Sequence, residues 1–286
     1  MNDCPVHCIT MKWGTYFQRI PKEKKMKLFD SHCHIDDSSF DNDRKSVIEK
    51  ARASDVCAMM IVSITEESAK KAVQIADDYS QCYASVGIHP HDSKMCSENS
   101  LSVLMELSQH PKVKAWGETG LDFNRMYSPQ KIQENWFIRQ LEIAENLDFP
   151  LIFHERDSNG RFLEMLKSYD PAERNGVVHC FSGSKKELTA YLDLNYDIGI
   201  TGIITQLKRG EYLRSLMRYI PKERMLIETD APYLTPMPEK KQFRRNEPAF
   251  VRSTFFKLCD IREEDPDDLA QTIWETTCRL YRIEET

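Results

Sequence analysis

The sequence predicts an α/β fold, a single (β/α)8 TIM barrel. Eight short apolar runs recur along the chain, stretches with helical periodicity lie between them, and no Gly/Ser-rich linker divides the 286 residues. Such alternation is typical of a parallel sheet, and a barrel of this kind takes about 250 residues. A doubly wound open sheet is the alternative architecture, but no G-x-G-x-x-G motif follows the first apolar run.

The apolar runs have strand length, and most are hydrophobic almost throughout, as expected for strands buried on both faces of a parallel sheet. In chain order they cover residues 27–30, 57–64, 82–87, 113–117, 150–154, 176–180, 196–200 and 225–228. The stretches between them are rich in helix formers and carry charges on one side. Four of these stretches predict helices, at residues 43–53, 66–79, 129–146 and 185–194.

The composition limits the function. Acidic residues outnumber basic ones, 45 against 39, which gives a formal net charge of −6. A nucleic-acid binder that relies on bulk charge is normally basic, so a polyanionic substrate would have to be held by local features or by metal ions. No apolar run approaches the roughly 18 residues of a membrane span. The nine scattered cysteines indicate reduced thiols and a cytoplasmic or nuclear location.

Residues 1–26 precede the first predicted strand and are expected to form an irregular extension, followed by one barrel domain at 27–286. The extension contains Cys4, His7 and Cys8. So short a cluster is a weak zinc signal, and we expect no metal site there.

The stretch FDSHCHI at residues 29–35 holds two histidines at alternating positions. In a strand, alternate side chains point to the same face, so His32 and His34 form half of a metal site. Further candidate ligands follow later apolar runs: Glu118, His154, His179 and Asp230. Barrels of this kind have their active sites at the C-terminal strand ends, where all these residues are predicted to lie. A hydrogen-bonded polar residue at a strand end would explain any one of them, but not the set.

Four imidazoles and two carboxylates on one face suit one or two divalent cations, and Glu118 is the carboxylate that would bridge a pair. Imidazole favours Zn, Mn or Fe over Mg, which prefers oxygen ligands. A bound cation makes hydroxide available near neutral pH and stabilises charge on the attacked oxygen. Asp230 would take the proton of that water as general base. The predicted reaction is metal-assisted hydrolysis, with Glu118 and Asp230 as catalytic residues.

Several sequence blocks resemble the TatD family of metal-dependent deoxyribonucleases. They are SHCHID at 31–36, VGIHPH at 86–91, GETGLDF at 117–123, HERD at 154–157, HCFSGS at 179–184, ETDAPYL at 228–234 and RRNEP at 244–248. The resemblance runs in order from about residue 27 to the C-terminus. It implies a TIM barrel of the metal-dependent hydrolase superfamily and divalent-metal-dependent hydrolysis of DNA, usually supported by magnesium and often exonucleolytic from the 3′ end.

The resemblance also implies site residues. The metal ligands would be His32, His34, Glu118, His154, His179 and Asp230, with Glu118 bridging two divalent ions. These ions would be Mg, Mn or Zn, and their identity stays open. DNA is the expected substrate, with RNA left open, and no obligate protein partner is predicted.

Other residues are candidates for substrate contact. His89 follows the third predicted strand, where it would touch a phosphate or the metal surroundings, while His91 would brace the turn at Pro90. Arg156 lies two residues beyond His154 and would pair with a phosphate oxygen as a bidentate donor, unless it forms a salt bridge with the neighbouring Asp157 or Glu155.

A basic run follows Asp230 in the long connection after the eighth predicted strand. It consists of Lys240, Lys241, Arg244 and Arg245. A basic run is usually a solvated surface, but the barrel places this one at its mouth. It is therefore the candidate source of the local positive field that an acidic chain needs to hold DNA.

Three functions are compatible with this pattern. A metal-dependent deoxyribonuclease is favoured by the basic run at 240–245. The alternative is a metal-dependent hydrolase of a small amide, lactone or phosphoester, because one barrel and one ligand arrangement serve many chemistries. A protein that binds metal or nucleic acid without turnover is disfavoured by the complete ligand set.

Overall fold

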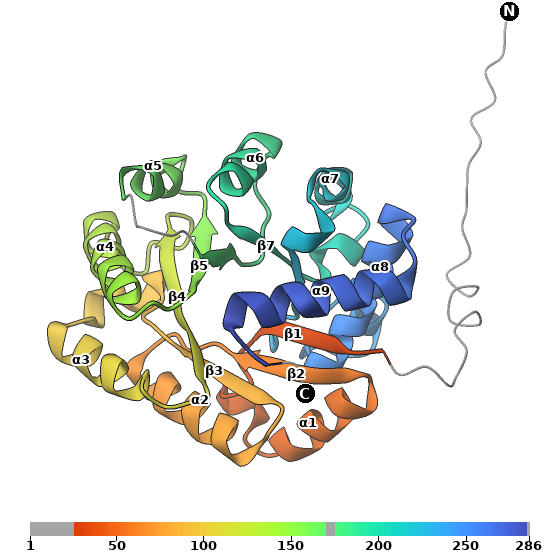
Figure 1. Ribbon diagram of the computed structural model, residues 1–286, viewed down its shortest axis with the longest axis horizontal. Coiled ribbons are helices and arrows are strands. Elements are labelled where there is room, and N and C mark those ends of the chain that lie inside the picture. The colour runs from red at the N-terminus through yellow and green to blue at the C-terminus, as the bar shows by residue number, and fades with distance from the viewer. Residues whose placement is uncertain (1–25, 170–174, 285–286) are drawn as a thin grey trace, which may run out of the picture.

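The computed structural model describes residues 26–169 and 175–284 (Figure 1). The predicted extension, with its Cys4, His7 and Cys8 cluster, lies outside these ranges except for Met26, which is buried in the core. Among the described residues, no helix is long and apolar enough to cross a membrane.

Eight strands form one sheet in the order β1 to β8, and each strand pairs in parallel with the next. Their bounds are β1 Leu28–Cys33, β2 Val56–Ile61, β3 Cys82–Val86, β4 Val113–Asp122, β5 Leu151–Arg156, β6 Gly176–Val178, β7 Asp197–Ile200 and β8 Met225–Ile227. Helices surround this sheet (Figure 1). The predicted (β/α)8 barrel is confirmed.

The barrel closes between β8 and β1 through hydrogen bonds that the residues after β8 make with β1 and with His34. The backbone N–H of Asp230 donates to the carbonyl of His32 at 2.9 Å, and the N–H of His34 donates to the carbonyl of Ala231 at 2.7 Å. The buried Asp30 carboxylate accepts hydrogen bonds from the backbone and hydroxyl of Thr229 at 2.8 and 2.6 Å. Closure of the barrel therefore brings the ligand-bearing segment of the first strand next to the one that follows the last strand.

Helices connect the strands in the order expected for a barrel. The α-helices are α1 Arg44–Ala53, α2 Glu66–Asp78, α3 Glu98–Leu107, α4 Gln130–Asn146, α5 Arg161–Ser168, α6 Lys185–Asp193, α7 Glu211–Leu216, α8 Val251–Arg262 and α9 Pro266–Tyr281. The four predicted helices agree with α1, α2, α4 and α6 to within one residue at each end. Thr65, Ser97 and Ser184 begin α2, α3 and α6 with capping boxes, which satisfy backbone N–H groups that a helix leaves unpaired.

Strand β4 is five residues longer than predicted. The prediction stopped at Gly117 because Glu118 and Thr119 are polar, yet the backbone continues to pair with β5 as far as Asp122 and Arg156. Gly120 makes this possible: its φ is +148°, and a Cβ there would lie 1.9 Å from the carbonyl oxygen of His154. Glu118 therefore lies inside the strand and not at its end.

The inside of the barrel is filled by apolar side chains from the strands and from α9. Phe29 of β1 is fully buried, and its ring lies 6.2 Å from Tyr83, 5.8 Å from Trp274 and 6.0 Å from Tyr281. Helix α9 packs across β1 and β8 (Figure 1). It supplies two of these three rings and covers the N-terminal end of the barrel, so the polar site lies at the opposite end.

Candidate metal centre

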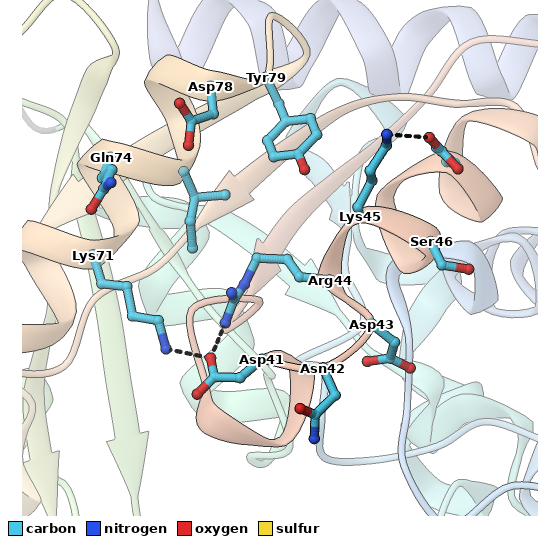
Figure 2. Close-up of a pocket in the computed structure, with 12 residues that line it drawn as sticks. Asp41, Asn42, Asp43, Arg44, Lys45, Ser46, Lys71, Gln74, Asp78 and Tyr79 are labelled. Carbon is cyan, nitrogen blue, oxygen red and sulfur yellow. Dashed lines mark hydrogen bonds and ion pairs between the residues drawn. The ribbon is translucent and has the colours of Figure 1, made fainter.

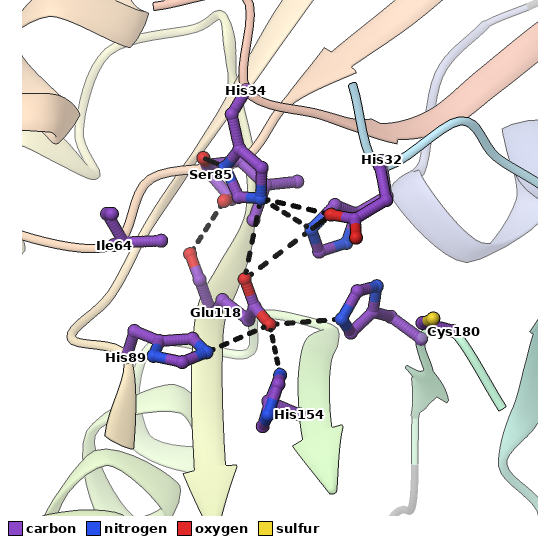
Figure 3. A network of polar contacts seen from close by, with 12 residues as sticks. His32, His34, Ile64, Ser85, His89, Glu118, His154 and Cys180 are labelled. Carbon is purple, nitrogen blue, oxygen red and sulfur yellow. Dashed lines mark hydrogen bonds and ion pairs between the residues drawn. The ribbon is translucent and has the colours of Figure 1, made fainter. Parts of the chain in front are cut away.

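The six predicted ligands converge at the C-terminal end of the barrel. His32, Glu118 and His154 lie within β1, β4 and β5, whereas His34, His179 and Asp230 follow the ends of β1, β6 and β8. Figure 3 shows the Glu118 carboxylate at the centre, with His34 and His32 on one side and His89 and His154 on the other.

The two oxygens of Glu118 face two groups of histidines. Oε1 lies 2.8 Å from Nδ1 of His154, 3.1 Å from Nε2 of His179 and 3.4 Å from Nε2 of His89. Oε2 lies 3.5 Å from Nε2 of His32 and 3.8 Å from Nε2 of His34. Burial would raise the pKa of Glu118, but the surrounding histidines outweigh it and hold the pKa well below its usual value. Glu118 is therefore an ionised carboxylate between two sets of nitrogen donors.

His32, His34 and Asp230 form one of these sets. Nε2 of His32 and Nε2 of His34 are 3.3 Å apart, and Nε2 of His34 lies 3.3 Å from Oδ1 of Asp230. The Nδ1–H of His34 donates to the carbonyl of Val62 at 2.7 Å, so the neutral form of His34 has its lone pair on Nε2. Asp230 has a φ of +57°, a region that non-glycine residues rarely adopt, and such strain is concentrated at functional sites.

These atoms fit divalent cations. His89, His91 and His154 offer one ligand atom each, all within 4.8 Å of one another, and three further groups drawn from the six predicted ligands do the same. These three further groups are His32, His34 and Glu118; Glu118, His154 and His179; and His32, His179 and Asp230. Two facing Nε2 atoms at 3.3 Å share at most one proton, whereas a cation accepts a lone pair from each. The donor set of imidazole and carboxylate is the one that Zn, Mn and Fe favour.

Comparison with known proteins gives the family. The family model of TatD-related DNases matches residues 29–282. The chain belongs to this family. It is 38% identical over 259 residues to a 3'-5' ssDNA/RNA exonuclease TatD of a Rahnella species, covering 90% of this chain and 98% of that protein. It is 39% identical over 258 residues to the exonuclease of the same name from Salmonella typhimurium, covering 90% and 99%.

Solved structures agree with the family assignment. The TatD homologue YJJV of Escherichia coli superimposes with a TM-score of 0.84 at 30% identity, covering 91% of this chain and all of that one. A TatD-family hydrolase of Entamoeba histolytica, at 24% identity and a TM-score of 0.82, shows the shared fold. The predicted family is confirmed, and the chain is a hydrolase of the predicted nuclease class.

Two buried carboxylates that the sequence analysis did not single out lie against the histidines of this TatD-family site. Oδ2 of Asp122 lies 3.2 Å from Nε2 of His154 and 2.8 Å from Nε2 of His91. Oε1 of Glu228 lies 3.3 Å from Nδ1 of His179. Each carboxylate faces the ring nitrogen opposite to the one directed at Glu118, the arrangement by which proteins fix the tautomer of a metal-ligating histidine.

Asp122 is saturated with hydrogen bonds. Besides the two histidines, it accepts the backbone N–H groups of Asn124 and Arg125 through Oδ1, at 3.0 and 2.7 Å. Burial would raise the pKa of Asp122, but the hydrogen bonds from His154 and His91 lower it well below its usual range. Both missed residues could have been found from their spacing, because side chains two or four residues apart in an extended segment point to the same face. Asp122 is four residues after Glu118, and Glu228 is two before Asp230.

The predicted substrate contacts differ in their surroundings. His89 is buried against Glu118 and belongs to the cluster, and burial lowers its pKa to about 3. Arg156 is exposed, with its Nε 4.0 Å from the Asp157 carboxylate, the salt bridge considered as the alternative role. Lys240, Lys241 and Arg244 are exposed in the connection after β8.

Arg245 differs from the other basic residues of this run. Its guanidinium binds the Asp43 carboxylate at 2.9 and 2.6 Å and lies 3.3 Å from Glu247. It also lies over the ring of Phe40, 4.4 Å from the centroid. Arg245 thus joins the connection after β8 to the segment preceding α1, and a phosphate contact would compete with these bonds.

One surface hollow of about 610 Å³ lies away from the metal centre, between α1 and α2 (Figure 2). In it Asp41 binds Lys71 at 2.8 Å and Arg44 at 2.5 Å. None of the predicted ligands lines this hollow, so it belongs to the outer surface of the TatD barrel.

Proposed function

We propose that this protein is a metal-dependent nuclease that hydrolyses single-stranded DNA from the 3′ end, with RNA as a second substrate. The observation that carries the proposal is Glu118, an ionised carboxylate whose two oxygens face separate groups of imidazoles. The names of the bacterial relatives, 3'-5' ssDNA/RNA exonucleases, support the polarity and the substrates.

The distances support the proposed ligand roles. His32, His34 and Asp230 would hold one cation, His154 and His179 a second, and Glu118 would bridge them. When bound, such cations make hydroxide available near neutral pH and stabilise charge on a phosphoryl oxygen. Imidazole-rich ligation favours Mn or Zn, whereas the family resemblance implies Mg.

Asp230 is the proposed general base. Burial would raise the pKa of Asp230, but its hydrogen bond with His34 and the charges of the nearby histidines lower it, so the carboxylate is ionised at neutral pH. Its side chain keeps 15% exposure, against 3% for Glu118, so water and substrate reach it more readily. A proton taken from water would be held on Asp230 beside His34.

Substrate phosphates would be held by side chains around this centre. We propose Arg156 and Arg244, both exposed near the mouth, as direct contacts, with Lys240 and Lys241 adding positive field. His89 would act from within the cluster, and Arg245 would contact phosphate only on leaving Asp43. The cytoplasmic or nuclear location stays a prediction.

The proposal is tested with 5′-end-labelled DNA and RNA oligonucleotides, single- and double-stranded, incubated with purified protein in Mg, Mn or Zn. We expect a ladder that shortens from the 3′ end of single strands and that chelator abolishes. Small amide, lactone and phosphoester substrates serve as the comparison. Turnover of one of these without cleavage of any oligonucleotide would contradict the nuclease function and favour the alternative hydrolase.

A further inference from the structure

Two exposed tyrosines stand beside histidines at opposite ends of the metal centre. We propose that Tyr127 and Tyr233 are stacking platforms that hold the nucleobases on the two sides of the scissile phosphate. The proposal rests on the nuclease function proposed above and assigns to that site two subsites for nucleobases.

Tyr127 lies in the connection between β4 and α4, at the C-terminal end of the barrel. It is 55% exposed, and its ring makes an edge contact with His91, 4.8 Å between centroids at 68°. The next residue is fixed: the Ser128 hydroxyl donates to the carbonyl of His91 at 2.8 Å, and the amide of Gln133 donates to the carbonyl of Ser128 at 2.8 Å. More than half of the Tyr127 side chain is thus open to solvent beside a backbone that Ser128 holds in place.

Tyr233 has the same features on the other side. It follows Asp230 by three residues, is 55% exposed, and its ring lies 6.1 Å from that of His34 at 65°. Its backbone N–H donates to the carbonyl of Asp230 at 2.8 Å, and its carbonyl accepts the side-chain amide of Asn246 at 2.7 Å. The ring position is therefore tied to a proposed ligand and general base.

The contacts place the two tyrosine rings at opposite ends of a series of contacting side chains that passes through Glu118. Tyr233 touches His34, which faces Oε2 of Glu118. Tyr127 touches His91, which shares Asp122 with His154, the histidine that faces Oε1 of Glu118. Figure 3 shows His34 and His154 on opposite sides of the Glu118 carboxylate. A phosphate held over Glu118 would have one ring toward each neighbouring nucleoside.

Exposure alone does not distinguish these tyrosines. The exposed large hydrophobic residues of the described chain also include Met95, Met126, Ile138, Leu207, Tyr212, Tyr219 and Phe243. Within residues 26–169 and 175–284, however, Tyr127 and Tyr233 are the members of this group whose rings contact a histidine of the site. Their location, and not a general excess of surface apolar groups, points to a ligand.

Nucleobases are the chemical class that suits such rings. Every base has a π-face, so stacking on an aromatic side chain holds a strand without reading its sequence. A chain with a net charge of −6 gains little long-range attraction to DNA, and stacking supplies affinity that does not depend on phosphate charge. Bases paired in a duplex are already stacked, so two such platforms also favour single strands.

The test compares enzyme and substrate changes together. Tyr127→Ala, Tyr233→Ala and the corresponding Tyr→Phe variants are loaded with Mn and assayed on a single-stranded oligonucleotide. Its counterparts carry a tetrahydrofuran abasic residue at the 3′-terminal or the penultimate position. Tyr212→Ala, which removes a tyrosine of 54% exposure that contacts no site histidine, is the matched control. Equilibrium binding in Ca and the Mn content of each variant are measured as well.

We expect each Ala variant to lose about 5- to 100-fold in affinity and kcat/KM, chiefly through KM. Phe variants should behave like the wild type, and the loss should disappear when the base opposite that tyrosine is absent. An equal loss on normal and abasic strands, an unchanged affinity, or a loss with Phe as large as with Ala would overturn the stacking role. Absence of turnover in the wild type would instead count against the nuclease function, while the binding measurements would still decide the stacking role.

Discussion

At the scale of single residues, the site depends on Glu118. It is held among five histidines, which lie between 2.8 and 3.8 Å from its two oxygens. These histidines also have other polar groups nearby. His34 contacts the carbonyl of Val62, and His154 contacts the carboxylate of Asp122. Substitution of Glu118 and substitution of a residue that contacts one of its histidines, such as Asp122, should therefore have different consequences.

We expect Glu118→Gln to abolish hydrolysis, with a fall in kcat of at least about 1,000-fold, while the fold is kept. The amide has the same shape but lacks the charge that would bridge two cations. Oligonucleotide cleavage and metal content are measured beside circular dichroism and thermal unfolding. A folded variant with near wild-type turnover would refute the assignment of the site.

Asp122→Asn should weaken metal binding by about 10- to 100-fold without preventing it. The amide group would donate toward Nε2 of His154, and the tautomer that leaves Nδ1 free for a cation would lose its partner. Activity should then recover at high metal concentration, which a merely unstable variant would not show. Asp157→Asn, a change in an exposed carboxylate on the same side of the barrel, is the control. Equal metal titration curves for the two variants would show that Asp122 does not position His154.

The six ligand candidates were predictable because each follows an apolar run and the barrel aligns the ends of its strands. Asp122 and Glu228 were not identified, because they act through a histidine and not on the substrate. The alternation that revealed His32 and His34 would also have pointed to Asp122, had the fourth strand been extended beyond Glu118. The continuation of β4 beyond Gly117 was not predicted, because the next residues are polar and buried parallel strands are expected to be apolar.

At the scale of elements, the connection after β8 has an exposed basic stretch and, after it, a part that is bound to the region of α1. Arg245 binds Asp43, and Lys50 binds Glu247 at 2.5 Å, so the later half of the connection is fastened to α1 and the residues before it. The preceding basic residues, on and after the 3-10 helix Glu239–Lys241, extend into solvent. Sequence alone grouped all four cations together, because the acidic partners of Arg245 lie elsewhere in the fold.

Replacing Lys240, Lys241 and Arg244 with Ala should weaken binding to single-stranded DNA. The slope of log affinity against log salt should become shallower, by up to about 0.7 for each phosphate that the variant no longer neutralises. Hydrolysis of bis(p-nitrophenyl) phosphate should change much less, because it requires the metal centre alone.

The control is a triple Ala variant of Arg52, Lys167 and Lys222, which lie in the last turns of α1 and α5 and just before β8, at the other end of the barrel. This variant loses the same number of positive charges, but far from the proposed DNA-binding site. If both variants leave the salt slope unchanged, the basic run is an ordinary solvated surface. If both alter it equally, only net charge matters.

At the scale of the whole molecule, the barrel and its proposed cations should stabilise one another. The ligands come from five strands or their C-terminal ends, and the closure between β8 and β1 runs through Asp230 and His34. Ligand binding to the folded state alone stabilises a protein by about 2.7 kcal/mol at one hundred times Kd.

Removal of divalent metal by chelator should therefore lower the thermal unfolding midpoint of this protein by several degrees, reversibly on adding Mn or Zn back. A His32→Asn, His179→Asn double variant lacks one ligand from each group and should respond little to either treatment. An identical response of wild type and double variant would place the stabilising metal elsewhere.

Deletion of residues 1–25 should leave cleavage of short oligonucleotides nearly unchanged, because none of the six proposed ligands is removed and the buried Met26, the first residue that the structure describes, is kept. Metal content and kcat/KM of the truncated protein are the measurements. A fall in either one would give Cys4, His7 or Cys8 a part in the site.

Helix α9 has a consequence for the order of events during translation. Its Trp274 and Tyr281 fill the barrel beside Phe29, and the Tyr281 hydroxyl donates to the carbonyl of Ser31 at 3.2 Å, next to His32. All six proposed ligands leave the ribosome before this helix does. The first strand therefore lacks its final support until residues 266–281 have been made. A protein that is proposed to cut single-stranded nucleic acid would then have no finished active site until α9 has packed against β1.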